Sequence, residues 1–369
     1  MFKKISPLFA LFAAFILCLF LAAVIMPDRT FSENENKVLT PMPEASIERI
    51  IDGRFETGYE NYVADQFPLR DSWIGMKSIS EYALMKGENN GIVYGDDDYL
   101  FAPVVSVNGE QMSKNISAIS DLAMCYDNVS LMVVPSSDRI LADKMPSGYP
   151  SVNQTEIIGS IYAGMPDNVN TIDVGSVLAK HSDEYIYYRT DHHWTTRGAY
   201  LAYLEFADSM GFAPVDTGSL NANTVEGFLG TSYSKSKNFN VVPDTITYYD
   251  SDAVINVNGT DHDIIYNFEQ FSKRDKYAGF LWGNSPISTV KNEKAADPDG
   301  SILVIRDSYA DCFVPFLAEQ YGTIDLVDLR YFRGDLAELC LNADEILILY
   351  GFSDIVSDVN VPQMTSAVK

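Results

Sequence analysis

The sequence predicts an α/β fold in which a parallel sheet has helices on both faces. Three short apolar runs near the C-terminus, 302–305, 324–327 and 345–350, carry this prediction. Helical stretches separate them at short spacing, and runs that are apolar throughout are typical of parallel strands with both faces covered. Of the 369 residues 47% are hydrophobic and 21% charged. This composition indicates a globular protein with a large core.

The N-terminus predicts a membrane segment. Lys3 and Lys4 precede an uncharged apolar stretch at 7–26. At about 1.5 Å per residue, this stretch is long enough to cross a bilayer core of ~30 Å. Because the two lysines favour the cytoplasmic side, everything after the stretch is expected outside. We therefore expect residues 1–27 to be a signal anchor of a single-pass cell-membrane protein. The alternative is a secreted protein that has lost a cleaved signal peptide.

The next segments indicate a stalk followed by helices. Residues 28–45 are polar and proline-containing, so we expect a stalk leading to an extracytoplasmic domain at 46–369. Ser46 is a good helix N-cap, and apolar residues follow it at helical spacing up to a break before Pro68. A second amphipathic stretch covers 71–85.

A small hairpin is expected next, from 92–94 and 99–101 on either side of Gly95. Three aspartates follow this glycine in its turn, which at first suggests a calcium loop. The later oxygen ligands of such a loop are missing, and this favours a charged turn.

From residue 110 onward, helices and strands alternate as in an α/β domain. The turn-rich region at 212–298 contains only short β-like runs and is expected to be an inserted β subregion. Besides the three C-terminal strands, we expect strands at 129–134, 171–174 and 185–188, and helices at 110–125, 195–210, 309–320 and 334–341.

Charge and cysteine content exclude two classes of partner. The formal net charge is −25, with 51 acidic against 26 basic residues. Such a field repels polyanions, so nucleic acid is not an expected partner. The four cysteines form no CxxC motif, which excludes a cysteine framework for zinc.

Reactive residue types gather at two positions expected just past strand ends, where parallel sheets place their functional side chains. One is Asp191-His192-His193-Trp194, and the other is Ser308 after the strand 302–305. A serine there lies near a helix N-terminus, whose free N–H groups stabilise an oxyanion. It also needs a base held by an acid.

Two other interpretations of the Asp191 cluster are open. It can be a polar turn that caps the following helix, with Trp194 in the core. A metal site is less consistent with the sequence, because adjacent histidines seldom point to one ion and no second ligand cluster is evident. We therefore predict neither a metal nor a cofactor.

The order of these motifs resembles a known family. Asp-x-His-Trp, followed about a hundred residues later by a strand ending in Asp-Ser-Tyr, is similar to the SGNH-like proteins of alginate O-acetylation. The string Asp191-His192-His193-Trp194 is still more similar to the DHHW proteins of Gram-positive bacteria. The resemblance continues in the segments 65–70, 93–95, 100–101, 276–277, 280–281, 283–284 and 328–332. It implies an SGNH-hydrolase-like (flavodoxin-like) fold with a permuted motif order.

The resemblance also implies roles for single residues. Asp191 corresponds to the orienting acid, His193 to the general base and Ser308 to the nucleophile, which leaves His192 as the extra residue. The last strand ends in Gly351-Phe352-Ser353-Asp354, with Ser353 where the family's Gly-x-Asn-Asp block has asparagine.

This departure leaves the oxyanion hole open. Asn284 is a substitute for the missing asparagine, although it can also be an ordinary turn residue. Arg330 either binds substrate or pairs with a carboxylate. Further candidates for oxyanion or substrate contacts are Gly283, Ser353 and Tyr309.

The function implied is an extracytoplasmic serine O-acetyltransferase that modifies a cell-surface or exported polysaccharide. Acetyl-CoA is absent outside the cell, so the resemblance implies a membrane acyl-donor partner of the MBOAT type. The alternatives are a carbohydrate esterase or deacetylase of the same fold, and a catalytically silent glycan-binding scaffold.

Overall fold

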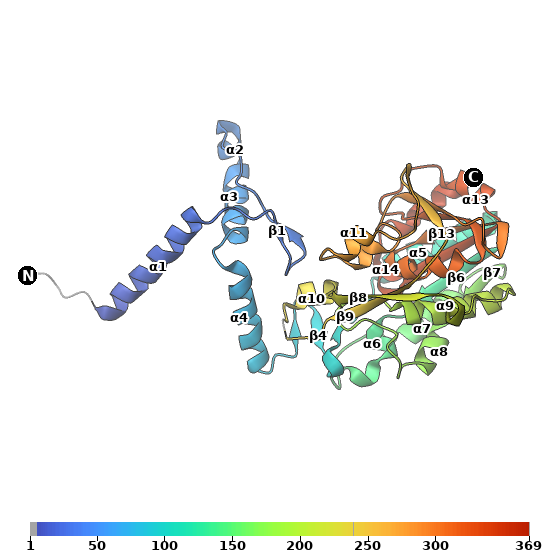
Figure 1. The fold of residues 1–369 in the computed structure, drawn as a ribbon, viewed down its shortest axis with the longest axis horizontal. Coiled ribbons are helices and arrows are strands. Elements are labelled where there is room, and N and C mark those ends of the chain that lie inside the picture. Colours follow the sequence, from blue (N-terminus) through green and yellow to red (C-terminus); the bar gives the residue numbers. More distant parts are fainter. Residues whose placement is uncertain (1–5, 239, 369) are drawn as a thin grey trace, which may run out of the picture. The chain divides into compact units, whose positions relative to one another are not determined.

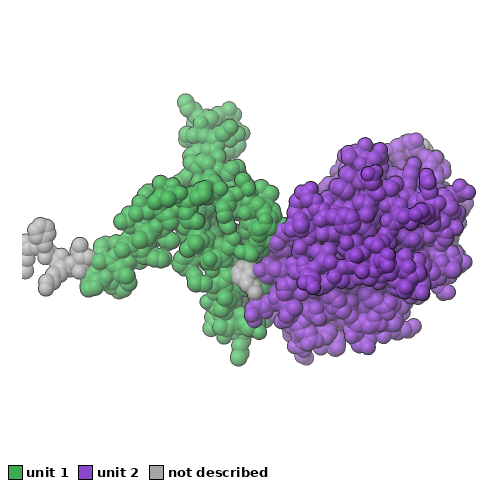
Figure 2. Space-filling view, viewed as in Figure 1, with its two compact units in different colours: residues 1–89, 237–239 green, residues 90–236, 240–369 purple. Residues whose placement is uncertain are grey.

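The computed structural model describes residues 6–238 and 240–368, which fall into two compact units (Figure 2). The first contains the chain up to Asn89 together with Lys237 and Asn238, and the second contains most of the remainder. The division after Asn89 lies later in the chain than the boundary at residue 45 that the sequence suggested.

The first unit is mostly helical (Figure 1). Its helix α1 is the one helix in the described chain that is long and apolar enough to cross a membrane, by length and composition. Ser46 caps α2 as expected, since its side chain accepts the Arg49 N–H. Gly53, with φ +78°, ends the helical pattern there and splits it into two helices. The elements are α1 (Pro7–Ile25), β1 (Phe31–Ser32), β2 (Lys37–Val38), α2 (Ile47–Ile51), α3 (Arg54–Asp65), α4 (Arg70–Ala83) and β3 (Glu88–Asn89).

An eight-stranded mixed sheet forms the centre of the second unit, in the order β11-β10-β12-β14-β13-β15-β6-β7. The three expected C-terminal strands are parallel neighbours, with Ile305 opposite Val327 and Val304 opposite Leu347. Three antiparallel strands extend one edge, so the expectation of a purely parallel sheet is corrected to a mostly parallel one. The strands are β6 (Val129–Val134), β7 (Val169–Ile172), β10 (Val254–Val257), β11 (Thr260–His262), β12 (Ile287–Lys291), β13 (Asp297–Arg306), β14 (Tyr321–Val327) and β15 (Glu345–Gly351).

The parallel strands follow the doubly wound order 2-1-3-4-5 when counting starts at β13 and returns through the N-terminal strands β6 and β7. In such sheets ligands bind beyond the carboxyl ends of the strands, where the strand order reverses. Here that point lies between β13 and β15. Ser308 follows β13 and Gly351 ends β15, so both occupy the reversal point.

Both faces of the sheet are covered, as the sequence predicted. Because side chains alternate along a strand, Leu303 and Ile305 pack on one face while Ile302 and Val304 pack on the other. The first face is covered by α5 (Gly109–Cys125), α7 (Gln154–Ala163), α13 (Leu336–Asn342) and α14 (Phe352–Ser357). The second is covered by α8 (Val174–Lys180), α9 (Thr196–Met210) and α12 (Val314–Leu317).

The remaining elements are short. The expected hairpin is present, as β4 (Ile92–Tyr94) pairs antiparallel with β5 (Leu100–Phe101). In its turn, Asp97 pairs with Lys144, which agrees with a charged turn. The others are α6 (Ser137–Ile140), β8 (Ala222–Phe228), α10 (Thr231–Ser236), β9 (Asp244–Tyr249), α11 (Phe268–Phe271) and the 3-10 turns Asp96–Asp98, Ala142–Lys144, Thr217–Ser219, Tyr277–Gly279, Ser308–Cys312 and Val361–Ala367.

Three expectations about local structure were wrong. Residues 185–188 form no strand and make only an isolated bridge between Tyr187 and Trp194. The helix expected at 309–320 is replaced by a 3-10 turn and the short α12, because Pro315 offers no N–H for a longer helical ladder. The region 212–298 is no separate subregion throughout, since β10, β11 and β12 join the main sheet.

Candidate active site

The loop that carries Asp191 is held in place by the core beneath it. The Tyr188 N–H donates to the His193 carbonyl at 3.2 Å, which closes a tight loop around Asp191. Trp194 is fully buried, and its Nε1–H donates to the Tyr309 carbonyl at 2.9 Å. This bond ties the loop directly to the turn that follows β13, and that turn carries Ser308.

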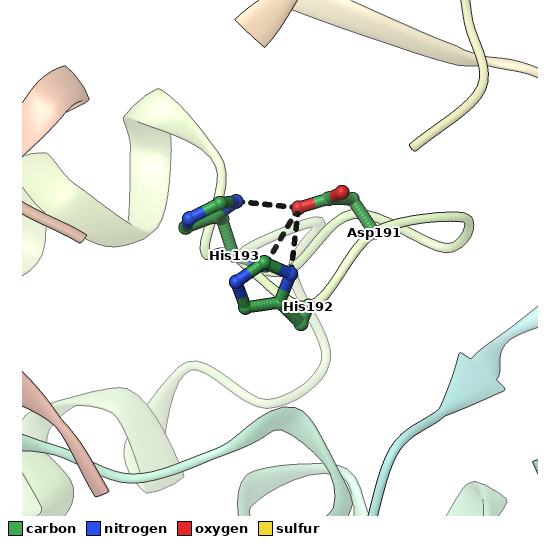
Figure 3. Close-up of side chains that lie close together, drawn as sticks. All are labelled: Asp191, His192 and His193. Carbon is green, nitrogen blue, oxygen red and sulfur yellow. Dashed lines mark hydrogen bonds and ion pairs between the residues drawn. The ribbon is translucent and has the colours of Figure 1, made fainter. Parts of the chain in front are cut away.

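Ser308, His193 and Asp191 form a continuous chain of hydrogen bonds. Ser308 Oγ lies 2.7 Å from His193 Nε2, and His193 Nδ1 lies 2.5 Å from Asp191 Oδ1. Figure 3 shows the Asp191 carboxylate directed at His193 Nδ1. The side chains of His193 and Asp191 are only 6% and 2% exposed, so bulk water competes little for these bonds.

The second carboxylate oxygen of Asp191 is held by Thr231. It accepts the Thr231 backbone N–H at 2.7 Å and the hydroxyl at 3.0 Å. Residue 230 has to be glycine for this approach, because a Cβ on Gly230 would lie 2.3 Å from the Asp191 side chain. Burial opposes ionisation of Asp191, but the two histidines and these hydrogen bonds outweigh it and lower its pKa. Asp191 is therefore an anion at neutral pH.

His193 is fixed in orientation and strengthened as a base. Its ring stacks on Tyr277, with centroids 4.0 Å apart and planes 11° from parallel. The Tyr277 hydroxyl in turn donates to the Ser308 carbonyl at 3.0 Å. Burial lowers the pKa of His193, yet the Asp191 carboxylate and its hydrogen bond raise it above the ordinary value overall.

His192 has a different environment. Its Nδ1 lies 2.8 Å from the Thr231 hydroxyl, and its side chain is 38% exposed. Burial of the ring and the neighbouring His193 lower its pKa to about 3, so it is neutral. The ligand atoms of Asp191, His192 and His193 lie within 4.8 Å of one another. Both nitrogens of His193 are already hydrogen-bonded, and a metal would have to displace Ser308 or Asp191.

The serine turn is joined to the end of β15 by Asp307. One Asp307 oxygen accepts the Tyr309 N–H at 2.8 Å and the other accepts the Gly351 N–H at 2.6 Å. A Cβ on Gly351 would lie 2.5 Å from the Tyr309 ring, so glycine permits this approach. Burial and the neighbouring Asp354 raise the pKa of Asp307 above its ordinary value. Tyr309 also donates its hydroxyl to the His192 carbonyl at 2.6 Å.

Asn284 is presented by a strained loop and oriented by a buried arginine. Leu281, Trp282 and Gly283 have φ values of +51°, +63° and +81°, a conformation unfavourable for the first two. Arg306 is 1% exposed and donates from Nη1 to Asn284 Oδ1 at 2.7 Å. Because a guanidinium only donates, the Asn284 NH₂ must face away from it.

The other residues proposed from the sequence have partners of their own. Arg330 forms a two-pronged ion pair with the buried Asp328, at 2.9 and 2.6 Å. The Gly283 N–H donates to the Phe280 carbonyl at 2.9 Å, so it is already engaged. Ser353 lies 3.4 Å from Asp354 through its hydroxyl. Arg330 therefore matches the carboxylate-pair interpretation.

Sequence reasoning missed several residues that shape the site. Gly230 and Thr231 gave no signal, because they are 39 and 40 residues from Asp191 and no motif marks the start of α10. Tyr277 belongs to a segment noted as a motif and Arg306 ends a predicted strand region, but no spacing rule indicates stacking on His193 or contact with Asn284.

A large hollow lies elsewhere in the second unit. It has a volume of about 630 Å³ and is lined by residues that follow β6 and β7, among them Arg139, Tyr162 and Ser176. None of its lining residues belongs to the Ser308 cluster, so the hollow is separate from Ser308 and His193.

Comparison with known proteins gives a family and a fold. The family model described as DHHW protein matches residues 79–327. A DHHW family protein from Eubacterium siraeum is similar in structure, with 23% identity over 76% of this chain and 95% of that chain and a TM-score of 0.62. PatB1 from Bacillus cereus, solved with a sulfonyl adduct, gives 20% identity over 74% and 98% of the two chains and a TM-score of 0.62.

A third structure is more distant. The O-acetyltransferase domain of Pseudomonas putida AlgJ shows 15% identity over 75% and 99% of the two chains, with a TM-score of 0.46. No curated protein matches the sequence. The first two similarities show a shared mixed α/β fold.

Proposed function

The chain belongs to the DHHW family, and from this premise we propose that it is an extracytoplasmic serine O-acetyltransferase of the SGNH type acting on a cell-surface or exported polysaccharide. One observation carries the proposal. Ser308, His193 and Asp191 are joined by hydrogen bonds of 2.7 and 2.5 Å, the arrangement that turns a serine hydroxyl into a nucleophile.

In the proposed first step, Ser308 Oγ attacks the carbonyl carbon of an acetyl donor. His193 Nε2 takes the hydroxyl proton as the new C–O bond forms, and then gives it to the leaving group as the tetrahedral intermediate collapses. Asp191 holds the Nδ1–H tautomer of His193 and stabilises the imidazolium that forms. The product is an acetyl ester on Ser308.

The second step is the reverse sequence with a sugar hydroxyl. His193 removes the proton of the hydroxyl as its oxygen attacks the acetyl carbon. Collapse of the second intermediate returns the proton to Ser308 Oγ and leaves the acetyl group on the glycan. Water in place of the sugar would give hydrolysis, so exclusion of water separates a transferase from an esterase.

Two donors are available for the oxyanion. The Ser308 N–H has no hydrogen-bond acceptor within the described residues, and the same holds for the Asn284 NH₂. Arg306 fixes the Asn284 amide so that only its NH₂ is presented to solvent. Asn284 thus supplies the amide that the family's motif has at the position of Ser353.

Location and partners follow from the N-terminus. The apolar helix α1 supports a signal anchor that holds the enzyme outside the cytoplasmic membrane. An activated acetyl group must then be supplied through the membrane, which supports an acyl-donor protein of the MBOAT type as partner. The acidic net charge of −25 favours a glycan acceptor that is not a polyanion.

The test uses the full chain in detergent with a chromogenic acetyl ester and added oligosaccharides. Wild type should release the chromophore and acetylate an oligosaccharide, and Ser308→Ala should do neither. Ser219→Ala, in an exposed 3-10 turn, is the matched control and should behave as wild type. A sulfonyl fluoride should label Ser308 in wild type and fail to label His193→Ala. Chromophore release that is unchanged in Ser308→Ala would refute the proposal.

A further inference from the structure

The helices of the first unit expose their apolar side chains. On α3, Tyr59 and Val63 are four residues apart, and Phe67 follows at the same spacing just after the helix. On α4, Trp73 and Met76 are three residues apart, and further apolar residues continue this spacing to the end of the helix. These stripes have the periodicity of a helix face that is normally buried. Each of these five side chains is nevertheless between 38% and 49% exposed.

Charged and polar groups occupy the inside of the same unit. Asp65 is 3% exposed and accepts hydrogen bonds from Lys37 Nζ at 2.8 Å and from the Thr40 N–H at 3.0 Å. Glu35 pairs with Arg70, and with Lys237 at 2.8 Å. Part of the inside of the unit is thus polar while these apolar side chains lie on its outside, a distribution unusual for a water-soluble helical domain.

The corner between α3 and α4 is tied to the chain just beyond α1. The Arg29 N–H donates to Gln66 Oε1 at 3.0 Å, and Gln66 Nε2 donates to the Arg29 carbonyl at 2.9 Å. The Arg29 guanidinium also pairs with Asp71 at 2.8 Å, and Tyr62 donates to Asp28 at 2.9 Å. Because α1 ends at Ile25, these bonds fix the corner at the outer end of the apolar helix.

The rings of Trp73 and Phe15 give the depth of α4. Their centroids are 6.3 Å apart and their planes are at 81°. Phe15 precedes the end of α1 by ten residues (25 − 15), which at about 1.5 Å per residue is ~15 Å along the helix. If α1 crosses a hydrocarbon core of ~30 Å, Phe15 lies near the middle of that core, and the Trp73 ring beside it lies deep in the outer leaflet.

We propose that α3 and α4 enter the outer leaflet from the interface of the membrane crossed by α1, with their apolar stripes against lipid acyl chains and Trp73 reaching toward the middle of the core. The occupant of the exposed face is therefore lipid. A hollow of about 560 Å³ is lined by Tyr59, Val63, Phe67 and Trp73 of the stripes together with Ala64, Ile74, Glu60 and Arg70, so most of its wall is apolar. Amphipathic helices with aromatic side chains on the apolar face are typical of this interface.

Tryptophan fluorescence tests the proposal on the full chain. The chain has three tryptophans: Trp73, the fully buried Trp194, and Trp282 in the second unit. The protein is reconstituted into phosphatidylcholine vesicles whose acyl chains are brominated near the headgroup or near the methyl end. Bromine quenches only on contact, so we expect quenching that is stronger with bromine near the methyl end. This quenching should vanish in Trp73→Phe and persist in the matched control Trp282→Phe.

Three results would overturn the inference. Quenching of Trp73 by aqueous iodide but not by brominated lipid would place α4 in water. Protection of Trp73 from both quenchers would mean that protein covers the stripe, for example a second copy of the chain. Recovery of a chain cleaved after α1, with no vesicle association, would remove the anchor on which the depth depends.

Discussion

The amide of Asn284 gives the sharpest test of the proposed oxyanion hole. Asn284→Ala removes one of the two proposed oxyanion donors but leaves Arg306 with its second partner, Asp311, at 2.6 Å. Loss of a single oxyanion donor costs about 2.7–4 kcal/mol of transition-state stabilisation, and at about 1.36 kcal/mol per decade this is a fall of roughly 10²–10³ in kcat. Because the ground-state carbonyl carries little charge, KM should change little.

The assay is initial-rate hydrolysis of a chromogenic acetyl ester, with thermal unfolding measured in parallel. The Asn284 side chain is exposed, so unfolding should hardly shift. Asn284→Asp is the more severe variant, since a carboxylate still accepts from Arg306 but repels the oxyanion. Arg306→Met should reproduce the kcat loss only in part, because the Asn284 amide stays in place but is free to flip. A fall of less than about fivefold in Asn284→Ala, with a normal fold, would refute the role.

The other predictions concern the triad and its support. Ser308→Ala, His193→Ala and the double variant should each lose on the order of 10³-fold or more in kcat, without additivity. The control His181→Ala, at a half-buried histidine paired with Glu184 outside the cluster, should lose nothing. Additive losses would show that Ser308 and His193 do not act as a unit. The pH–rate profile should rise with pH through a midpoint above the ordinary histidine pKa of about 6.5, because His193 must be neutral to accept a proton and Asp191 raises its pKa. In Asp191→Asn the burial of His193 remains but the charge that raises its pKa is gone, so any residual activity should have a lower midpoint. A midpoint that does not move would contradict the assignment. Thr231→Val removes a hydroxyl from the Asp191 carboxylate, a bond to a charged group worth about 1.5–3 kcal/mol, so kcat should fall roughly tenfold to a hundredfold, while Thr231→Ser should retain activity.

The sequence was most informative where one local rule determines the structure. The apolar runs of β13, β14 and β15 indicated buried parallel strands because both of their faces are covered by helices. Ser46 was recognised as a helix cap because its side chain serves the backbone three residues on. In these places the cause of the structure lies within a few residues of its effect.

Prediction failed where the cause lies far along the chain. Residues 185–188 have the composition of a strand, yet Tyr187 and its neighbours follow a path set by distant partners. The Tyr187 hydroxyl donates to the Pro135 carbonyl, and the Thr195 N–H returns to the Ile186 carbonyl. The edge strands β10 to β12 were likewise assigned to an insertion, because pairing with β14 cannot be read from their own residues.

The site itself combines the two situations. Ser308 could be singled out from the sequence as a candidate because it directly follows an apolar strand, and functional side chains lie just past the ends of parallel strands. In the sheet this strand, β13, ends at the reversal point. The proposed acid and base lie instead in a loop between α8 and α9 that belongs to no strand of the sheet. When the strands are counted from β13, the sheet has the doubly wound strand order. Ser308 therefore follows the first strand of that order, at the reversal point. The loop that carries Asp191 and His193 must also be held next to the serine turn. Trp194 joins the two through its hydrogen bond to the Tyr309 carbonyl. Trp194→Phe should therefore preserve much of the packing but loosen the His193–Ser308 contact. We expect a clear fall in kcat in the ester assay and only a small shift in the thermal unfolding temperature.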